Sequence, residues 1–159
     1  MTRPARLAGL LYGTAVLAYA LDRVTKAWAA DALSGRAPIE VIPGALHLTY
    51  TTNSGGAFGF GQSAPWLFAG ATILVAGIVV VVSARLSHAL VAVALGLVLG
   101  GALGNLTDRV MNGPGLTGRV TDFIDLRIWP VFNLADTSVV VGALLLALAS
   151  FRREEREAG

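Results

Sequence analysis

Carboxylates are the side chains of this sequence best suited to chemistry. The 159-residue chain contains no cysteine and has two histidines, His47 and His88, which are far apart. Without cysteine there is no disulfide, thiolate nucleophile or cysteine-ligated metal site. Two distant histidines do not favour a histidine metal site or a histidine-based triad. Aspartate and glutamate therefore remain as the candidate acids and bases.

The composition indicates that these carboxylates act in or at a membrane. Hydrophobic residues make up 55% of the chain and charged residues 14%, whereas average soluble chains are about a quarter charged. This excludes a disordered protein, a coiled coil and an ordinary soluble enzyme. The net charge of +2 is too small to suggest a nucleic-acid partner. An integral membrane protein remains.

Four charge-poor segments are long enough to cross a bilayer, whose hydrocarbon core of about 30 Å needs roughly 20 helical residues. At that length the expected spans are residues 7–26, 65–84, 89–108 and 132–151, with long connections at 28–64 and 109–131. The first span also resembles a signal peptide, but we interpret it as a retained span. We expect a single membrane domain, 1–159, of the all-α integral membrane class: four transmembrane helices with a small β-rich extracytoplasmic loop domain.

The distribution of Lys and Arg sets the expected orientation. Four spans place both termini on one side, where basic residues are denser than in the long connections. By the positive-inside rule, both termini are expected in the cytoplasm and the long connections outside. In the first connection, apolar residues alternate around Pro43-Gly44, which predicts a β-hairpin on the membrane surface. Trp28, Trp66 and Trp129 lie near the outer boundary, as an aromatic belt would.

Several polar residues share one depth beneath the outer surface. If the first span ends at Lys26, Asp22 lies roughly 6 Å inside the outer boundary. Asn105, Asn133 and Asp136 fall at the same level in the third and fourth spans. A carboxylate at that depth costs a few kcal/mol unless it is paired or faces water. We therefore expect Asp22, Asn105, Asp136 and also Asp122 to form one polar site.

Each of these residues also has a structural interpretation. Asp22 and Lys26 have the spacing of a simple helical ion pair, and Asp136 is suited to cap a helix N-terminus. Asp108 and Arg109 would fit a solvated helix end. Asp122 and Asp125 would fit an ordinary loop, and Gly96, Gly100 and Gly104 are interpreted as a close helix-packing face.

Two other functions fit parts of the pattern. Intramembrane Asp22 and Asp136 would suit a small proton-coupled transporter or channel subunit. However, the second and third spans lack polar residues in their middles, so no relay to the cytoplasm is visible. The glycine face of the third span would suit a non-enzymatic helix-packing partner.

The order of the polar motifs along the chain is more specific than any one of them. The series is Leu21-Asp22-Arg23-Val24-Thr25-Lys26, then Asn53-Ser54-Gly55-Gly56-Ala57-Phe58-Gly59, Gly100-Gly101-Ala102-Leu103-Gly104-Asn105-Leu106-Thr107-Asp108-Arg109, Val120-Thr121-Asp122-Phe123-Ile124 and Phe132-Asn133-Leu134-Ala135-Asp136-Thr137. It resembles the boxes of bacterial lipoprotein signal peptidase, the type II signal peptidase. The resemblance extends from Leu21 to Ser138.

The resemblance implies an intramembrane aspartyl endopeptidase that cleaves diacylglyceryl-modified prolipoproteins immediately before the lipidated cysteine. It implies a monomer in the bacterial cytoplasmic membrane with its site at the outer face, in contact with membrane lipid, and without a metal or cofactor. The catalytic aspartates would be Asp122 and Asp136. Substrate-binding positions would be Asn53, Asn105, Arg109 and Asn133, and Asp22 with Lys26 would support the site. Asp125 is a departure from the family pattern.

The chemistry of such a pair follows from electrostatics. Two carboxylates about 3 Å apart cannot both ionise comfortably, so they share one proton and titrate as a pair. The charged member accepts a proton from water, while the neutral member donates to the scissile carbonyl.

Overall fold

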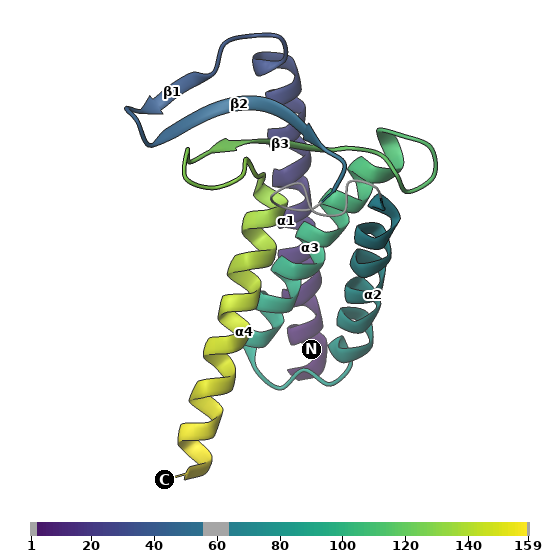
Figure 1. Cartoon of the computed structure of the whole chain (residues 1–159). Helices are drawn as coiled ribbons and strands as arrows, with labels where there is room; N and C mark the ends of the chain where they lie inside the picture. The colour runs from purple at the N-terminus through teal and green to yellow at the C-terminus, as the bar shows by residue number, and fades with distance from the viewer. Residues whose placement is uncertain (1–2, 56–63, 159) are drawn as a thin grey trace.

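The computed structural model describes residues 3–55 and 64–158. These residues form the helices α1 (Arg3–Leu33), α2 (Pro65–Ser83), α3 (Ala89–Met111) and α4 (Leu134–Ala158), and the strands β1 (Ile39–Ile42), β2 (Leu46–Asn53) and β3 (Val120–Asp125). The helices run side by side and the strands cross one end of the bundle (Figure 1). Both termini and the α2–α3 connection lie towards the other end.

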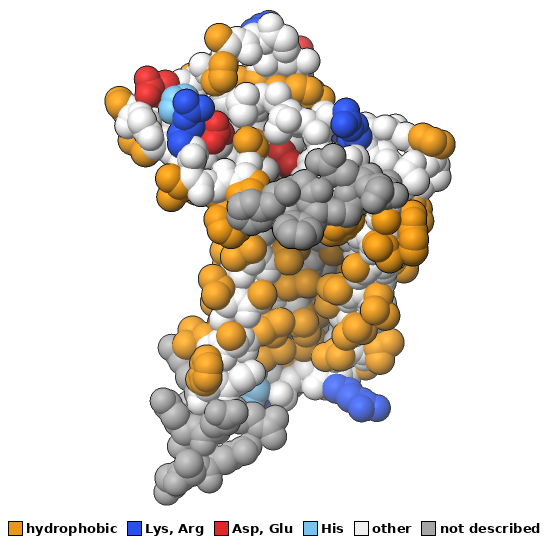
Figure 2. Space-filling view, viewed as in Figure 1, with side chains coloured by type: hydrophobic (Ala, Val, Ile, Leu, Met, Phe, Trp, Pro, Cys, Tyr) orange, Lys and Arg blue, Asp and Glu red, His pale blue; other side chains and the backbone are white. Residues whose placement is uncertain are grey.

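The helices expose apolar side chains on their outer surfaces. Four examples are Val16, Leu17, Val81 and Leu144, which are between 60% and 73% exposed. Figure 2 shows apolar side chains over the helical bundle. Exposing this much apolar surface to water would be costly, whereas lipid tails cover it without penalty. In the described part of the chain, four helices are long and apolar enough to cross a membrane. The predicted fold class is confirmed.

Glycines let α3 pack closely against its neighbour α1. A Cβ atom on Gly96 would lie 2.5 Å from the backbone oxygen of Leu11, and one on Gly100 would lie 2.5 Å from that of Ala15. One turn further along α3, a Cβ atom on Gly104 would collide with the carboxylate of Asp22. The predicted helix-packing face is confirmed, and it brings the polar residues of α1 and α3 together.

The strands form one antiparallel sheet in the order β1-β2-β3. The predicted hairpin around Pro43-Gly44 is β1 and β2, with Gly44 at a φ of 69° in its turn, a value that glycine adopts readily. β3, from the second long connection, pairs with β2. Phe123 of β3 packs in a small core with Ala29 and Leu33 at the end of α1. This packing fixes the sheet across the ends of the helices.

Candidate active site

Asn133 caps the N-terminus of α4 and holds Asp136 in its first turn. The Asn133 Oδ1 atom accepts a hydrogen bond from the backbone N–H of Asp136 at 2.9 Å, and the Asp136 Oδ2 atom accepts one from the backbone N–H of Asn133 at 3.2 Å. This reciprocal arrangement is a capping box. Asn133 is therefore the cap residue, and Asp136 lies three residues into the helix with its carboxylate turned back towards the helix start.

The same asparagine binds Asp122. Phe132 forms a β-bridge with Ile124, which brings the start of α4 alongside β3. The Asn133 Nδ2 atom donates to Asp122 Oδ1 at 2.6 Å. Asn133 is completely buried and Asp122 is 3% exposed. Two carboxylates from different elements are thus hydrogen-bonded to one residue, Asp122 to the side chain of Asn133 and Asp136 to its backbone N–H.

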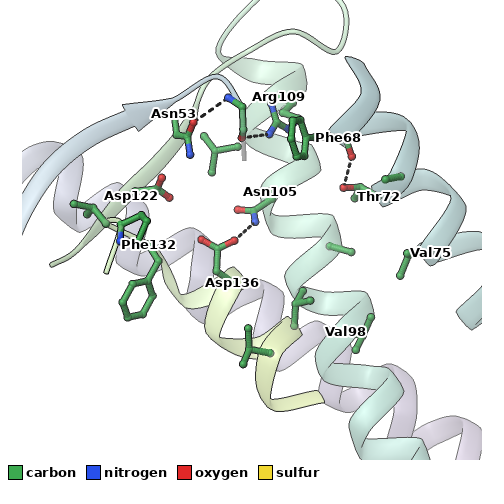
Figure 3. A pocket seen from close by; sticks show the side chains of 18 of the residues that line it. Asn53, Phe68, Thr72, Val75, Val98, Asn105, Arg109, Asp122, Phe132 and Asp136 are labelled. Carbon is green, nitrogen blue, oxygen red and sulfur yellow. Dashed lines mark hydrogen bonds between the residues drawn. The ribbon is translucent and has the colours of Figure 1, made fainter. Parts of the chain in front are cut away.

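Asn105 of α3 approaches the pair from the other side. Its Nδ2 atom donates to Asp136 Oδ1 at 2.8 Å (Figure 3). Its Oδ1 atom accepts from Lys26 Nζ at 2.8 Å and from Asn133 Nδ2 at 3.2 Å. Because the carbonyl oxygen faces the cationic Lys26, the amide NH₂ group is turned towards Asp136.

Lys26 belongs to a buried ion cluster, defined here as Asp22, Arg23, Lys26 and Asp108. Lys26 Nζ lies 3.0 Å from Asp22 Oδ2 and 3.0 Å from Asp108 Oδ2, and Arg23 pairs with Asp108 Oδ1. Asp22 Oδ1 accepts from the backbone N–H of Ala135 at 2.9 Å, at the start of α4. Asp22 and Asp108 are at most 2% exposed. Asp22 and Lys26 form the predicted pair as part of a larger network.

The interpretation of Asp108 and Arg109 as a solvated helix end is wrong, because the sheet covers the end of α3. Arg109 is 4% exposed. It donates to the backbone oxygens of Ser54 at 3.2 Å and Gly55 at 3.1 Å, and its guanidinium lies 5.5 Å from the centre of the Phe68 ring. Arg109 therefore links the end of β2 to α2.

Asn53, the last residue of β2, completes the polar wall. Its Oδ1 atom accepts from the backbone N–H of Gly55 at 2.9 Å, and its side chain hydrogen-bonds to Asp122. Residues 56–59 of the motif that begins at Asn53 lie outside the described residues.

These side chains border a cavity of about 430 Å³. The polar part of its wall is formed by Asn53, Asn105, Arg109, Asp122 and Asp136. Below them the wall is mainly apolar, with Val75 from α2 and Val98 from α3 (Figure 3), and with Val140 from α4. The cavity therefore presents two carboxylates at one end and a lipid-like surface at the other.

The pKa of Asp122 is raised to about 7, mainly by burial and then by the negative charge of nearby Asp136. Hydrogen bonds from Asn133 and Asn53 and the charge of Lys26 act the opposite way without cancelling the rise. A carboxyl group with this pKa keeps a proton over much of the neutral range. The site can therefore offer an acid beside a carboxylate.

Asp125 does not join the pair. Its carboxylate accepts from the backbone N–H of Arg127 at 2.7 Å and lies 3.4 Å from the Arg127 guanidinium. Arg127 has a φ of 65°, a left-handed conformation unusual for a residue other than glycine. Asp125 therefore stabilises the turn after β3, which explains an acid so close to Asp122.

The predicted site residues form two connected groups. Asp122, Asp136, Asn53, Asn105 and Arg109 line the cavity. Asn133, Asp22 and Lys26 lie behind it, buried and hydrogen-bonded or ion-paired to the first group or to α4. Sequence reasoning missed Asp108 as part of the buried ion cluster, although its place three residues before the end of an apolar helix and near Lys26 in depth was a usable signal. It also missed Phe68 and the other cavity residues of α2, a helix without charged residues.

Comparisons with known proteins identify the family. The sequence model of the family described as Signal peptidase (SPase) II matches residues 14–152. The chain belongs to the signal peptidase II family. The lipoprotein signal peptidase of Streptomyces coelicolor is 43% identical over 155 residues, which cover 95% of this chain and 74% of the relative. That of Syntrophomonas wolfei is 43% identical over 151 residues, covering 92% and 98%.

Solved structures agree with this family assignment. Two bacterial membrane enzymes solved by the in meso method superpose with TM-scores of 0.83 and 0.76, at 32% and 35% sequence identity. The alignments cover 93% and 89% of this chain, and 91% and 92% of the solved chains. As a member of the signal peptidase II family the chain is a membrane protease, and none of these comparisons supports the transporter hypothesis.

Proposed function

We propose that this protein is an intramembrane aspartyl endopeptidase that removes the signal peptide of diacylglyceryl-modified prolipoproteins immediately before the lipidated cysteine. Family membership supports the class of substrate. The observation that carries the mechanism is that Asp122 and Asp136 are hydrogen-bonded to the same Asn133 while both line one cavity. No metal or cofactor is needed for this chemistry.

In the resting enzyme the proton belongs on Asp122 and the negative charge on Asp136. Asp136 receives N–H groups on both oxygens, from Asn105 and from the backbone of Asn133, and lies in the first turn of α4. N–H donors and the positive end of a helix both stabilise a carboxylate. Asp122 lies on a strand, and burial raises its pKa to about 7. The two environments therefore divide the roles of acid and base.

The reaction then proceeds by general acid–base catalysis on a water molecule. Asp136 accepts a proton from water as the water oxygen bonds to the scissile carbonyl carbon, and Asp122 gives its proton to the carbonyl oxygen. The product is a neutral gem-diol. As the C–N bond breaks, the nitrogen takes the proton now on Asp136, and a gem-diol hydroxyl returns a proton to Asp122. The dyad ends in its starting state.

The remaining polar residues have positioning and binding roles. Lys26 fixes the orientation of the Asn105 amide, and Asp22 holds the start of α4 through Ala135. Asn133 positions both carboxylates. Asn53, Asn105 and Arg109 line the cavity, where we assign them to substrate binding. Arg109 also holds the backbone at Ser54 and Gly55.

The position of the site fits the substrate. The cavity lies where the helices meet the sheet, so its polar end is near the headgroups and its apolar end is among lipid tails. A diacylglyceryl group and an apolar signal segment need such a wall, while the bond to be cut reaches the carboxylates. We place both termini in the cytoplasm, the site at the outer face of the bacterial cytoplasmic membrane, and the enzyme as a monomer.

The test is cleavage of a synthetic diacylglyceryl prolipoprotein peptide by the purified protein in detergent. Asp122→Asn and Asp136→Asn are each expected to lower kcat by at least about a thousandfold, since the acid or base is lost. Asp125→Asn removes the same charge three residues from Asp122 and should leave kcat within a few-fold. Near-normal cleavage by either of the first two variants would refute the mechanism.

A further inference from the structure

A second cavity, which the proposed reaction does not use, lies on the other face of the sheet. Successive residues of a strand point to opposite faces. Asn53, Val120 and Asp122 line the active-site cavity, whereas their strand neighbours Thr52 and Thr121 line a separate cavity of about 450 Å³. Thr52 and Thr121 are register partners in β2 and β3. The sheet is therefore a partition between two cavities.

The wall of this second cavity is rich in hydrogen-bond donors. The cavity is lined by Arg23 and Lys26 from α1, by Arg119 just before β3, and by the hydroxyl-bearing residues Tyr50, Thr52 and Thr121. Arginine and lysine side chains are donors only, and hydroxyl groups can also donate. Asp108 is the carboxylate among the lining residues.

Asp108 has no oxygen left for a ligand that carries donors. Its Oδ1 atom accepts from Arg23, and its Oδ2 atom accepts from the backbone N–H of Thr121 at 3.1 Å and lies 3.0 Å from Lys26. The pairing with Arg23 uses one of that residue's nitrogen atoms, Nη1, so other N–H groups of the guanidinium remain for another acceptor.

Arg119 adds a positive charge that the cluster does not neutralise. The two carboxylates of the buried ion cluster balance the charges of Arg23 and Lys26. Within residues 3–55 and 64–158, the Arg119 side chain has neither an ion pair nor a hydrogen bond, although its backbone oxygen accepts from Asn112. The cavity therefore has unused donors and net positive charge, which suits an anion with several oxygens.

The depth of the cavity points to a lipid as the source of that anion. The cavity borders α1 at Lys26 and Ala27, next to the half-exposed Trp28, and tryptophan marks the headgroup level of a membrane. Val16 lies seven residues before Arg23, so it is on the same face of α1, and it is 67% exposed. A lipid whose headgroup enters the cavity can therefore lay its chains along α1.

We propose that this cavity, between the outer end of α1, the end of α3 and strands β2 and β3, binds the phosphate of an outer-leaflet phospholipid. Arg119 and Arg23 contact the phosphate oxygens, and the hydroxyl groups of Thr52 and Tyr50 complete the site. The diacylglyceryl group of the proposed substrate carries no phosphate, so this lipid is a resident of the enzyme and not its substrate.

Binding is tested by native mass spectrometry of the protein in a neutral detergent and phosphate-free buffer, with phosphatidylglycerol as the probe and diacylglycerol as the phosphate-free lipid. The wild type should retain phosphatidylglycerol and not diacylglycerol. Arg119→Gln should weaken retention about fivefold, the effect of one basic residue at a membrane surface. Ala30→Leu, which fills part of the cavity without changing charge, should also weaken it.

Arg36→Gln is the matched control, because it removes an exposed arginine that does not line the cavity. Equal losses in Arg119→Gln and Arg36→Gln, or full retention by Ala30→Leu, would show a general surface attraction and overturn the proposal. Displacement of the lipid by millimolar inorganic phosphate would assign the site to the free ion and overturn its assignment to a lipid. Because the readout is binding, it does not depend on the proposed proteolysis.

Discussion

Two pairs of carboxylates lie next to each other in this molecule, and they differ in how their charge is compensated. In the buried ion cluster, Asp22 and Asp108 are each in contact with cations. At the proposed active site, Asp122 and Asp136 receive hydrogen bonds mainly from asparagines and the backbone. Both pairs sit where charge is costly.

We interpret this difference as the distinction between structural carboxylates and the proposed catalytic ones. A carboxylate in contact with a cation can hold elements together, as Asp22 does for α1 and α4. A carboxylate without a cation in contact can lower its energy by holding a proton, which is the property an acid catalyst requires. Two neighbouring pairs of aspartates thus differ in role because Lys26 and Arg23 contact only the pair Asp22 and Asp108.

The largest effect is expected from removing the shared cation. Lys26→Met leaves Asp22 and Asp108 buried with Arg23 as the remaining cation of the cluster. Breaking a buried ion pair in this way costs roughly 3–5 kcal/mol. We expect a large fall in the thermal unfolding temperature in detergent. Asp122→Asn changes the other pair and should not lower the unfolding temperature. If both variants lowered the unfolding temperature equally, the two pairs would not differ as we infer.

Asp122→Asn should stabilise the protein, and more so as the pH rises. The pKa of Asp122 is about 7 in the folded state against 3.8 for the ordinary group. The folded state therefore holds the proton more tightly, and its stability falls as the pH rises from about 4 through 7. The neutral asparagine lacks that loss, which is on the order of 3 kcal/mol. Unfolding temperatures at pH 5 and pH 8 measure it.

Asp125→Asn is the control for this pH dependence, since Asp125 lies outside the dyad and contacts Arg127. The difference between Asp122→Asn and the wild type should grow from pH 5 to pH 8. A constant difference would mean that Asp122 is ionised throughout. The same proton predicts that kcat/KM of the wild type falls above about pH 7, where Asp122 can no longer donate.

A smaller effect is expected at the glycine that makes room for Asp22. Gly104→Ala would place a methyl group against the Asp22 carboxylate, and such overpacking costs about 1–3 kcal/mol. Gly9→Ala is the matched control on α1, because a Cβ atom there meets nothing within 4 Å. It should be neutral or slightly stabilising, since alanine favours helices. Equal unfolding temperatures for the two variants would contradict the close approach.

Much of the fold could be predicted because its signals are local in the sequence. Bilayer thickness determines the length of an apolar helix, and strand alternation around Pro43-Gly44 indicates a hairpin. Placing Asp22, Asn105 and Asp136 at one depth required only a count of residues along helices. The cost of charge in lipid then made it reasonable to expect them together.

The remaining features depend on contacts between distant segments. The depth that Asp108 shares with Lys26 indicates a pairing, but its burial also depends on the sheet, and no pattern near Asp108 reports that sheet. The cap of α4 was expected at Asp136 and is Asn133, because the β-bridge of Phe132 with Ile124 sets where the helix begins. The lining contributed by Phe68 follows from the packing of α2, whose sequence has no charged residue to mark one face.

The position of Asn133 also has a consequence for biogenesis. The hydrogen bonds at the start of α4 also position Asp136. The side-chain amide of Asn133, which forms one of them, donates to Asp122 as well. A nascent chain whose last span has entered the bilayer but whose third strand is still unpaired therefore has no assembled dyad. The proposed proteolytic activity is therefore expected only after the fold is complete, so that partly assembled molecules do not cleave other proteins.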